Sequence, residues 1–291
     1  MKRESFGSRL GFILVSAGCA IGIGNVWKFP YICGAYGGAA FILIYLCFLV
    51  ILGIPVLVAE FAVGRGSHTS VAKCFDKLAP AGSGWKPLKF IGIIGCYMLM
   101  MFYTTVGGWM IYYCVKSLRG DFVGATPEAV TQSFSDMLGN APTMMLWMVI
   151  ICLIGFAVCF MGLQNGIEKI SKVMMSALLI IMVILAVHSV MMEGAGEGIR
   201  FYLIPDFQKI KEAGVGNVVF AALSQSFFTL SIGIGAMLIF GSYLDKSRSL
   251  TGEAVSITVL DTFVALTAGF IIIPACFSYG CLLYTSPSPR D

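Results

Sequence analysis

Two segments of this 291-residue chain place glycines and polar side chains in the middle of otherwise apolar stretches. They are residues 18–30 and residues 224–235. Polar side chains inside an apolar stretch of membrane-spanning length are expensive, and they mark functional positions. The polar side chains of the two segments are therefore candidates for a ligand site: Asn25, Lys28, Gln225, Thr229 and Ser231.

The glycines of these segments weaken helical structure, because glycine costs ~1 kcal/mol per residue in a helix relative to alanine. Backbone carbonyls freed at membrane depth each cost several kcal/mol unless they line a cavity or bind a ligand. Gly18 and Gly22 also fit an alternative interpretation, a small-residue face that packs against a neighbouring helix. The polar neighbours favour a ligand site, because a packing face has no need of them.

The elements that carry these segments are predicted to be membrane-spanning helices. The chain is 58% hydrophobic and 12% charged, with a mean hydropathy of +0.90, whereas soluble domains have roughly 25% charged residues. A soluble globular domain is excluded, and nucleic acid is not an expected partner. A membrane helix needs ~20 apolar residues, and runs of this kind predict spans at about residues 10–31, 39–63, 88–115, 143–162, 170–191, 216–241 and 254–279.

The charge distribution predicts the topology of these spans. Most Lys and Arg residues fall in the tail and loops on one side, which places the N-terminus in the cytoplasm of a multi-pass protein of the plasma (inner) membrane. The ten cysteines lie mostly inside apolar runs and show no metal-binding spacing. His68 and His188 are isolated, and no nucleophile–base pair appears at useful spacing, so the sequence does not predict an enzyme.

From Arg3 to about Gly280, the sequence resembles the neurotransmitter:sodium symporter family, and within it the bacterial amino-acid transporters of the leucine-transporter type. The most specific motifs are RLGFI from Arg9, GIGNVWKFP from Gly22, EFAVGR from Glu60 and SQSFFTLS from Ser224. The resemblance implies an all-α inverted-repeat sodium symporter fold with discontinuous helices 1 and 6. It also implies sodium-coupled transport by alternating access. The protein is expected to lie in the lipid bilayer, and a homodimer is possible.

The resemblance also divides the chain. Such proteins have about twelve spans, so we expect a fragment truncated after about seven transmembrane helices, whose natural sequence continues beyond Gly280. The expected parts are a cytoplasmic tail (1–9), a first repeat with helices 1–5 (10–191), a partial second repeat with an outer loop and helices 6–7 (192–280), and an out-of-pattern tail (281–291).

Two sodium ions are implied, and no organic cofactor is expected. The first ion would be bound by the Ala20 carbonyl, the substrate carboxylate and the side chains of Asn25, Thr229 and Asp261. The second would take the carbonyls of Gly18 and Ile21.

The implied substrate is an amino acid. Gly22 stands where monoamine transporters of the family have an aspartate, which favours a ligand that brings its own carboxylate, and the apolar side chains of the site favour an apolar or aromatic substrate. The resemblance implies that Tyr103 contacts that carboxylate, whereas without the family the preferred interpretation is an aromatic that fills a helix interface. The implied substrate residues are Gly22, Gly24, Asn25, Leu99, Tyr103, Phe228, Thr229, Ser231 and Ile234.

The resemblance also implies which residues form the gates and whether transport needs chloride. Arg3 and Phe6 match the inner gate of the family, and Lys28 stands at the outer-gate position, where relatives usually have Arg. Chloride is not expected to be required, because Asp261, one helical turn before Ala265, supplies a fixed negative charge where relatives bind the anion. The alternatives to a symporter are a passive ion channel, a non-transporting amino-acid sensor and an inactive truncated fragment.

Overall fold

The computed structural model describes residues 6–280, and within them it is helical. Five described helices are long and apolar enough to cross a membrane, or six if one bent pair counts as a single span. The predicted position of Arg3 in the inner gate lies outside the described residues. The helical membrane fold expected from composition is confirmed.

The first predicted span is broken near its middle. Helix α1 (Arg9–Ala20) begins after Ser8, whose hydroxyl accepts a hydrogen bond from the Gly11 N–H and so caps the helix. A π-helical segment, η1 (Gly24–Lys28), follows the break and continues into α2 (Phe29–Ala35). The two halves are bent by 55° relative to each other, so the predicted discontinuity of this span is confirmed.

The sixth predicted span is broken in the same way. Helix α12 (Val215–Thr229) ends at mid-span and α13 (Ala236–Gly241) resumes after six residues. Between them, Ser231 has a φ of 52° and Gly233 a φ of 91°. These left-handed conformations cannot continue an α-helix, and the predicted discontinuity of the sixth span is therefore confirmed.

The remaining spans are continuous and include two further π-helical segments. They are α3 (Ala39–Phe48) with η2 (Leu49–Gly53) and α4 (Ile54–Ser67), α6 (Leu88–Arg119), α8 (Ala141–Phe160), η3 (Leu163–Glu168) with α9 (Lys169–Val190), and α14 (Leu250–Ser278). The loops contain four helices that the sequence did not predict: α5 (Val71–Leu78), α7 (Pro127–Gly139), α10 (Ala195–Leu203) and α11 (Phe207–Ala213).

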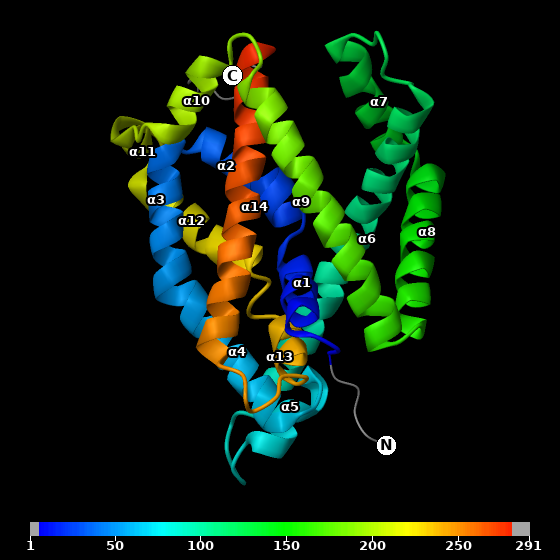
Figure 1. The fold of residues 1–291 in the computed structure, drawn as a ribbon, viewed down its shortest axis with the longest axis vertical. Coiled ribbons are helices and arrows are strands. Elements are labelled where there is room, and N and C mark those ends of the chain that lie inside the picture. The colour runs from blue at the N-terminus through cyan, green and yellow to red at the C-terminus, as the bar shows by residue number, and fades with distance from the viewer. Residues whose placement is uncertain (1–5, 281–291) are drawn as a thin grey trace.

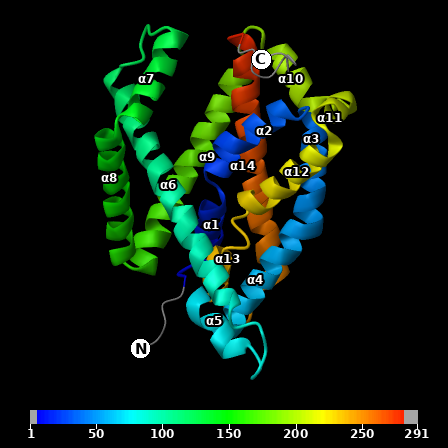
Figure 2. The same cartoon turned by 180° about the vertical axis from the view of Figure 1, so that it is seen from behind.

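Helix α14 runs through the middle of the bundle and packs against α1, α2, α4, α9 and α10 (Figure 1). Helices α7 and α8 stand to one side in both views, and α6 runs obliquely from beside them to α5 under the middle of the bundle (Figures 1 and 2). Helix α8 also meets η3. The start of α1 lies at the same end of the bundle as α5, and α10 and α11 lie at the other. The segment after the first break, η1, contacts both α14 and α12. The two breaks therefore lie close together beside α14.

Candidate ion and substrate site

The two broken spans and α14 meet at the side-chain amide of Asn25. Its Nδ2 donates to the Thr229 hydroxyl at 3.0 Å and to the Asp261 carboxylate at 2.8 Å, and it lies 3.1 Å from the Asp261 carbonyl oxygen. The Thr229 hydroxyl in turn donates to the other Asp261 carboxylate oxygen at 2.8 Å. All three side chains are fully buried. Three residues separated by up to 236 positions thus form one polar cluster.

This cluster holds a carboxylate away from water. No Lys, Arg or His of the described residues forms an ion pair with Asp261. A buried carboxylate is costly unless a cation or several hydrogen bonds compensate it. The Thr229 hydroxyl and the Asp261 carboxylate are oxygen groups that suit a hard cation, whereas the Asn25 amide oxygen accepts from the Gly22 N–H at 3.2 Å.

The backbone at the first break contributes further oxygens. Across it, the Ile21 N–H donates to Ala17 at 2.6 Å, and the N–H groups of Asn25 and Val26 both donate to Gly22. Within the described residues, none of the backbone bonds that cross the break goes to the carbonyls of Ala20 or Ile21. These two carbonyls are therefore available to a ligand.

Gly18 lies two residues before the end of α1 and faces α9. A Cβ on Gly18 would come within 3.2 Å of the Met175 sulfur on α9. This contact fits the packing interpretation of the glycine pair. It leaves the expected role of the Gly18 carbonyl as a sodium ligand a prediction.

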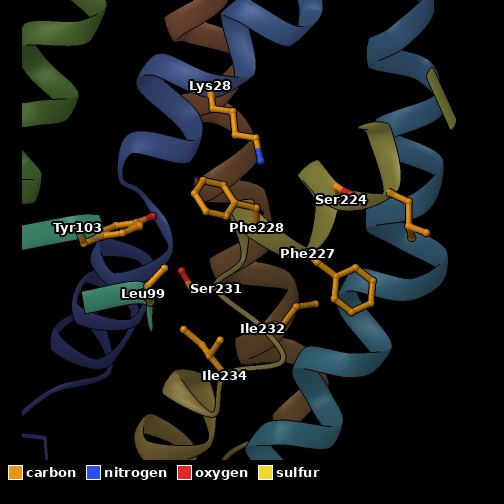
Figure 3. Close-up of a pocket in the computed structure, with 10 residues that line it drawn as sticks. Lys28, Leu99, Tyr103, Ser224, Phe227, Phe228, Ser231, Ile232 and Ile234 are labelled. Carbon is orange, nitrogen blue, oxygen red and sulfur yellow. The ribbon is translucent and has the colours of Figure 1, made fainter. Parts of the chain in front are cut away.

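A cavity of about 520 Å³ opens beside the cluster (Figure 3). Five of the predicted substrate residues line it, together with the predicted outer-gate residue Lys28. Four further lining residues, from α12 and the second break, were not among the predicted substrate residues. The complete lining is Lys28, Leu99, Tyr103, Leu223, Ser224, Phe227, Phe228, Ser231, Ile232 and Ile234.

Tyr103 points from α6 across the cavity towards the first break (Figure 3). Its hydroxyl would lie 3.9 Å from a Cβ placed on Gly22, and its ring centroid lies 6.3 Å from that of Phe228. A polar group at one end of an otherwise apolar cavity can fix the orientation of a small ligand. The described structure therefore places the Tyr103 hydroxyl and an apolar wall around the same space.

Gly24 allows the two broken spans to approach closely. A Cβ there would come within 2.9 Å of the Phe228 ring, a distance that side chains do not tolerate. The Gln225 amide donates to the Gly24 carbonyl at 2.9 Å and holds the same junction together. The Ser231 hydroxyl donates to the carbonyl of Cys19 at 3.1 Å, so it links the second break to the first.

Glu60 is a site residue that the sequence analysis quoted only as part of a motif. Its carboxylate accepts from the Gly233 N–H at 2.5 Å and the Leu238 N–H at 3.2 Å. It thereby satisfies backbone donors freed by the second break. A carboxylate within an apolar span was the available signal, because such residues are expensive in a membrane and mark functional positions.

Of the predicted gate residues, the structure describes Lys28 and Phe6, which lie on either side of the break in the first span. The Lys28 Nζ sits 4.2 Å from the centroid of the Phe228 ring, a cation–π contact that covers the cavity from above in Figure 3. At the start of α1, the ring of Phe6 packs edge-on against Phe12 and Tyr243, with centroids 5.4 and 5.9 Å apart.

Comparison with known proteins agrees with this geometry. The model of the "Sodium:neurotransmitter symporter family" matches residues 3–128 and 127–279. An uncharacterized sodium-dependent transporter of Bacillus subtilis, YhdH, is 36% identical over 96% of this chain and 61% of its own length. A second uncharacterized sodium-dependent transporter, from Haemophilus influenzae, is 33% identical over 96% of this chain and 62% of its own length.

A solved structure shares the fold. The crystal structure of MhsT in complex with L-phenylalanine superposes with a TM-score of 0.88 and 38% sequence identity, over 98% of this chain and 64% of that chain. Two broken spans around a buried polar cluster thus give this chain the helical membrane fold of that protein. The chain belongs to the sodium:neurotransmitter symporter family, and it spans less than two thirds of the length of these relatives.

Proposed function

We propose that this chain is part of a symporter that couples the uptake of an apolar or aromatic amino acid to sodium by alternating access. The observation that carries the proposal is the buried junction of Asn25, Thr229 and Asp261. It joins both broken spans to α14 at the level of the cavity. A cation bound there would compensate the carboxylate and draw the two spans together.

In this proposal, the first sodium ion is held by the Ala20 carbonyl and by oxygens of Asn25, Thr229 and Asp261. The carbonyls of Gly18 and Ile21 contribute to a second ion. The substrate carboxylate would complete the first sodium site and meet the Tyr103 hydroxyl. Sodium and substrate would then bind cooperatively, because each contributes a ligand or a charge to the other's site.

The walls of the cavity support an apolar or aromatic side chain for the substrate. Leu99, Phe228 and Ile234 line the space beside Tyr103, and such walls penalise a buried charge. The related MhsT was crystallised with L-phenylalanine, which makes that amino acid a suitable probe. We propose a plasma-membrane location with the start of α1 at the cytoplasmic side, as the charge distribution of the loops indicates.

Chloride is not part of the proposed cycle. The Asp261 carboxylate already provides a negative charge beside the proposed sodium ion. Its neighbour one turn later, Ala265, is buried and has no group that binds an anion. The charge balance of the site is therefore met by the protein.

The test is equilibrium binding of radiolabelled L-phenylalanine to the purified protein in sodium and in potassium medium. We expect saturable binding in sodium medium, lost when potassium replaces sodium. Equal binding in the two media would contradict sodium coupling. Binding that requires sodium but never supports accumulation in vesicles would instead favour a sensor.

A further inference from the structure

Glu168 is a buried carboxylate at the start of α9's span that the proposed ion and substrate site does not use. It is 3% exposed. One of its oxygens accepts from the Gly7 backbone N–H at 2.9 Å, and the other accepts from the Ser8 hydroxyl at 3.3 Å. The latter oxygen also pairs with Lys172 Nζ at 2.6 Å. The carboxylate therefore joins the fifth span to the residues that begin α1.

The fit of Glu168 to α1 depends on a glycine. A Cβ on Gly11 would meet the Glu168 carboxylate group, with Cδ only 2.5 Å away. Ser8 caps α1 by accepting from the Gly11 N–H, so Glu168, Ser8 and Gly11 form one continuous contact. A negative charge at this end of α1 is also favoured by the helix dipole.

A second contact joins the start of α1 to α14. Arg9 Nε lies 2.9 Å from a carboxylate oxygen of buried Glu253, and the Arg9 side chain is 52% exposed. Glu168 instead accepts hydrogen bonds from two groups, the Gly7 N–H and the Ser8 hydroxyl. It therefore joins the start of α1 to the fifth span at two points.

Because the first span is broken after Ala20, the contact with Glu168 can control whether α1 moves. The inner half of the first span, α1, is separated from the outer half by the break and a 55° bend. A half-helix attached through such a break can move as a unit if its far end is released. Its far end is where Glu168 binds.

We propose that Glu168, with Gly7, Ser8, Gly11 and Lys172, forms a latch that holds α1 closed against the fifth span and sets how readily the inner side of the transporter opens. Glu168 is a positioning residue in this proposal, since it touches neither ion nor substrate. The inference rests on the proposed alternating-access function. It adds to the expected inner gate, which was assigned to Arg3 and Phe6.

The experiment measures exposure of α1 directly. Ser16 on α1 is fully buried, and a Ser16→Cys variant carries a thiol that an aqueous reagent reaches only when α1 moves away. A membrane-impermeant maleimide is applied to vesicles from the side at which α1 begins, without sodium or amino acid. Modification of each cysteine is followed by peptide mass spectrometry, which separates the introduced thiol from the native ones.

In the Glu168→Ala background, we expect the introduced thiol to react at least about tenfold faster, because one hydrogen bond to a charged group already corresponds to that factor and the substitution removes two such bonds from the start of α1. Glu168→Gln keeps an acceptor for the Gly7 N–H and should give a smaller increase. Asp76→Asn is the matched control, because it removes a carboxylate from the exposed ion pair with Lys89 at the same end of the bundle. It should leave the rate unchanged.

Gly11→Ala provides an independent route to the same state. The added methyl group displaces Glu168, so this substitution alone should also accelerate modification. When Gly11→Ala is combined with Glu168→Ala, it should have no further effect, because the Glu168 side chain that the methyl group displaces is absent. Gly155→Ala, at a helical glycine with open space around it, is the control for the change of residue type.

Native Cys74 distinguishes opening of α1 from general loosening of the fold. It is fully buried on α5, at the same end of the bundle, and its modification rate should stay at the parent level in the Glu168 and Gly11 variants. Unchanged modification of the introduced thiol in Glu168→Ala would overturn the latch, as would equal acceleration at Cys74. Since the assay contains no sodium or substrate, acceleration without sodium-driven uptake would contradict only the proposed function.

Discussion

Substituting Tyr103 with phenylalanine tests whether the cavity binds the carboxylate of an amino acid. The substitution removes one hydroxyl and keeps the ring that packs against Phe228. Within the described residues, that hydroxyl forms no hydrogen bond with the protein, so its removal leaves no protein group unsatisfied. The expected cost is therefore only the bond to the ligand carboxylate.

A hydrogen bond to a charged group contributes about 1.5 to 3 kcal/mol. Since 1.4 kcal/mol is tenfold in an equilibrium constant, the Kd for L-phenylalanine should rise roughly 10- to 150-fold. The assay is equilibrium binding of the radiolabelled amino acid in saturating sodium. Tyr97→Phe is the matched control, because Tyr97 lies on the same helix and is 67% exposed, and it should leave the Kd unchanged.

A Kd for Tyr103→Phe equal to that of the parent would refute this reasoning. Tyr103 would then serve only to pack against Phe228, which is the alternative that the sequence left open. A loss of binding in both tyrosine variants would point to a damaged helix α6 instead of a lost carboxylate contact. It would contradict the assignment equally.

Three further predictions concern the ion site and its surroundings. Asp261→Asn should raise the sodium concentration needed for half-maximal binding about tenfold or more, because a buried charge partner is lost; exposed Asp136→Asn should not, and an unchanged sodium dependence would remove Asp261 from the ion site. Gly24→Ala should abolish L-phenylalanine binding while Gly196→Ala, which has open space around it, should preserve it; normal binding by the former would show that the contact with Phe228 is not needed. Replacing chloride by gluconate should leave sodium-driven uptake unchanged, and a strict chloride requirement would contradict the proposed role of the Asp261 charge.

The sequence predicted the two broken spans because the signal for them is local. Glycines and polar side chains within ~20 apolar residues are visible without knowledge of any partner. Gly24 and Gly233 lie in the segments singled out at the start, and the structure has both breaks there. The loop helices were missed because they are short; α5 and α10 have eight and nine residues, too few to show a membrane-length pattern.

The side-chain contacts of the site were less accessible from the sequence. Glu60 binds backbone groups more than 170 residues away, and Glu168 binds residues about 160 positions earlier. No periodicity or spacing connects such partners. The family resemblance supplied expectations for Asn25, Thr229 and Asp261, and the fold brings these three side chains within hydrogen-bonding distance. Their roles as sodium ligands remain predictions for the measurements above.

Accumulation of L-phenylalanine in proteoliposomes tests the central claim most directly. The protein is reconstituted into vesicles loaded with potassium, and radiolabelled amino acid is added outside with either sodium or potassium. Coupled transport predicts an internal concentration above the external one, only with the inward sodium gradient, that collapses when an ionophore dissipates that gradient. Uptake that merely reaches the external concentration, or that is the same in potassium medium, would contradict sodium-coupled symport.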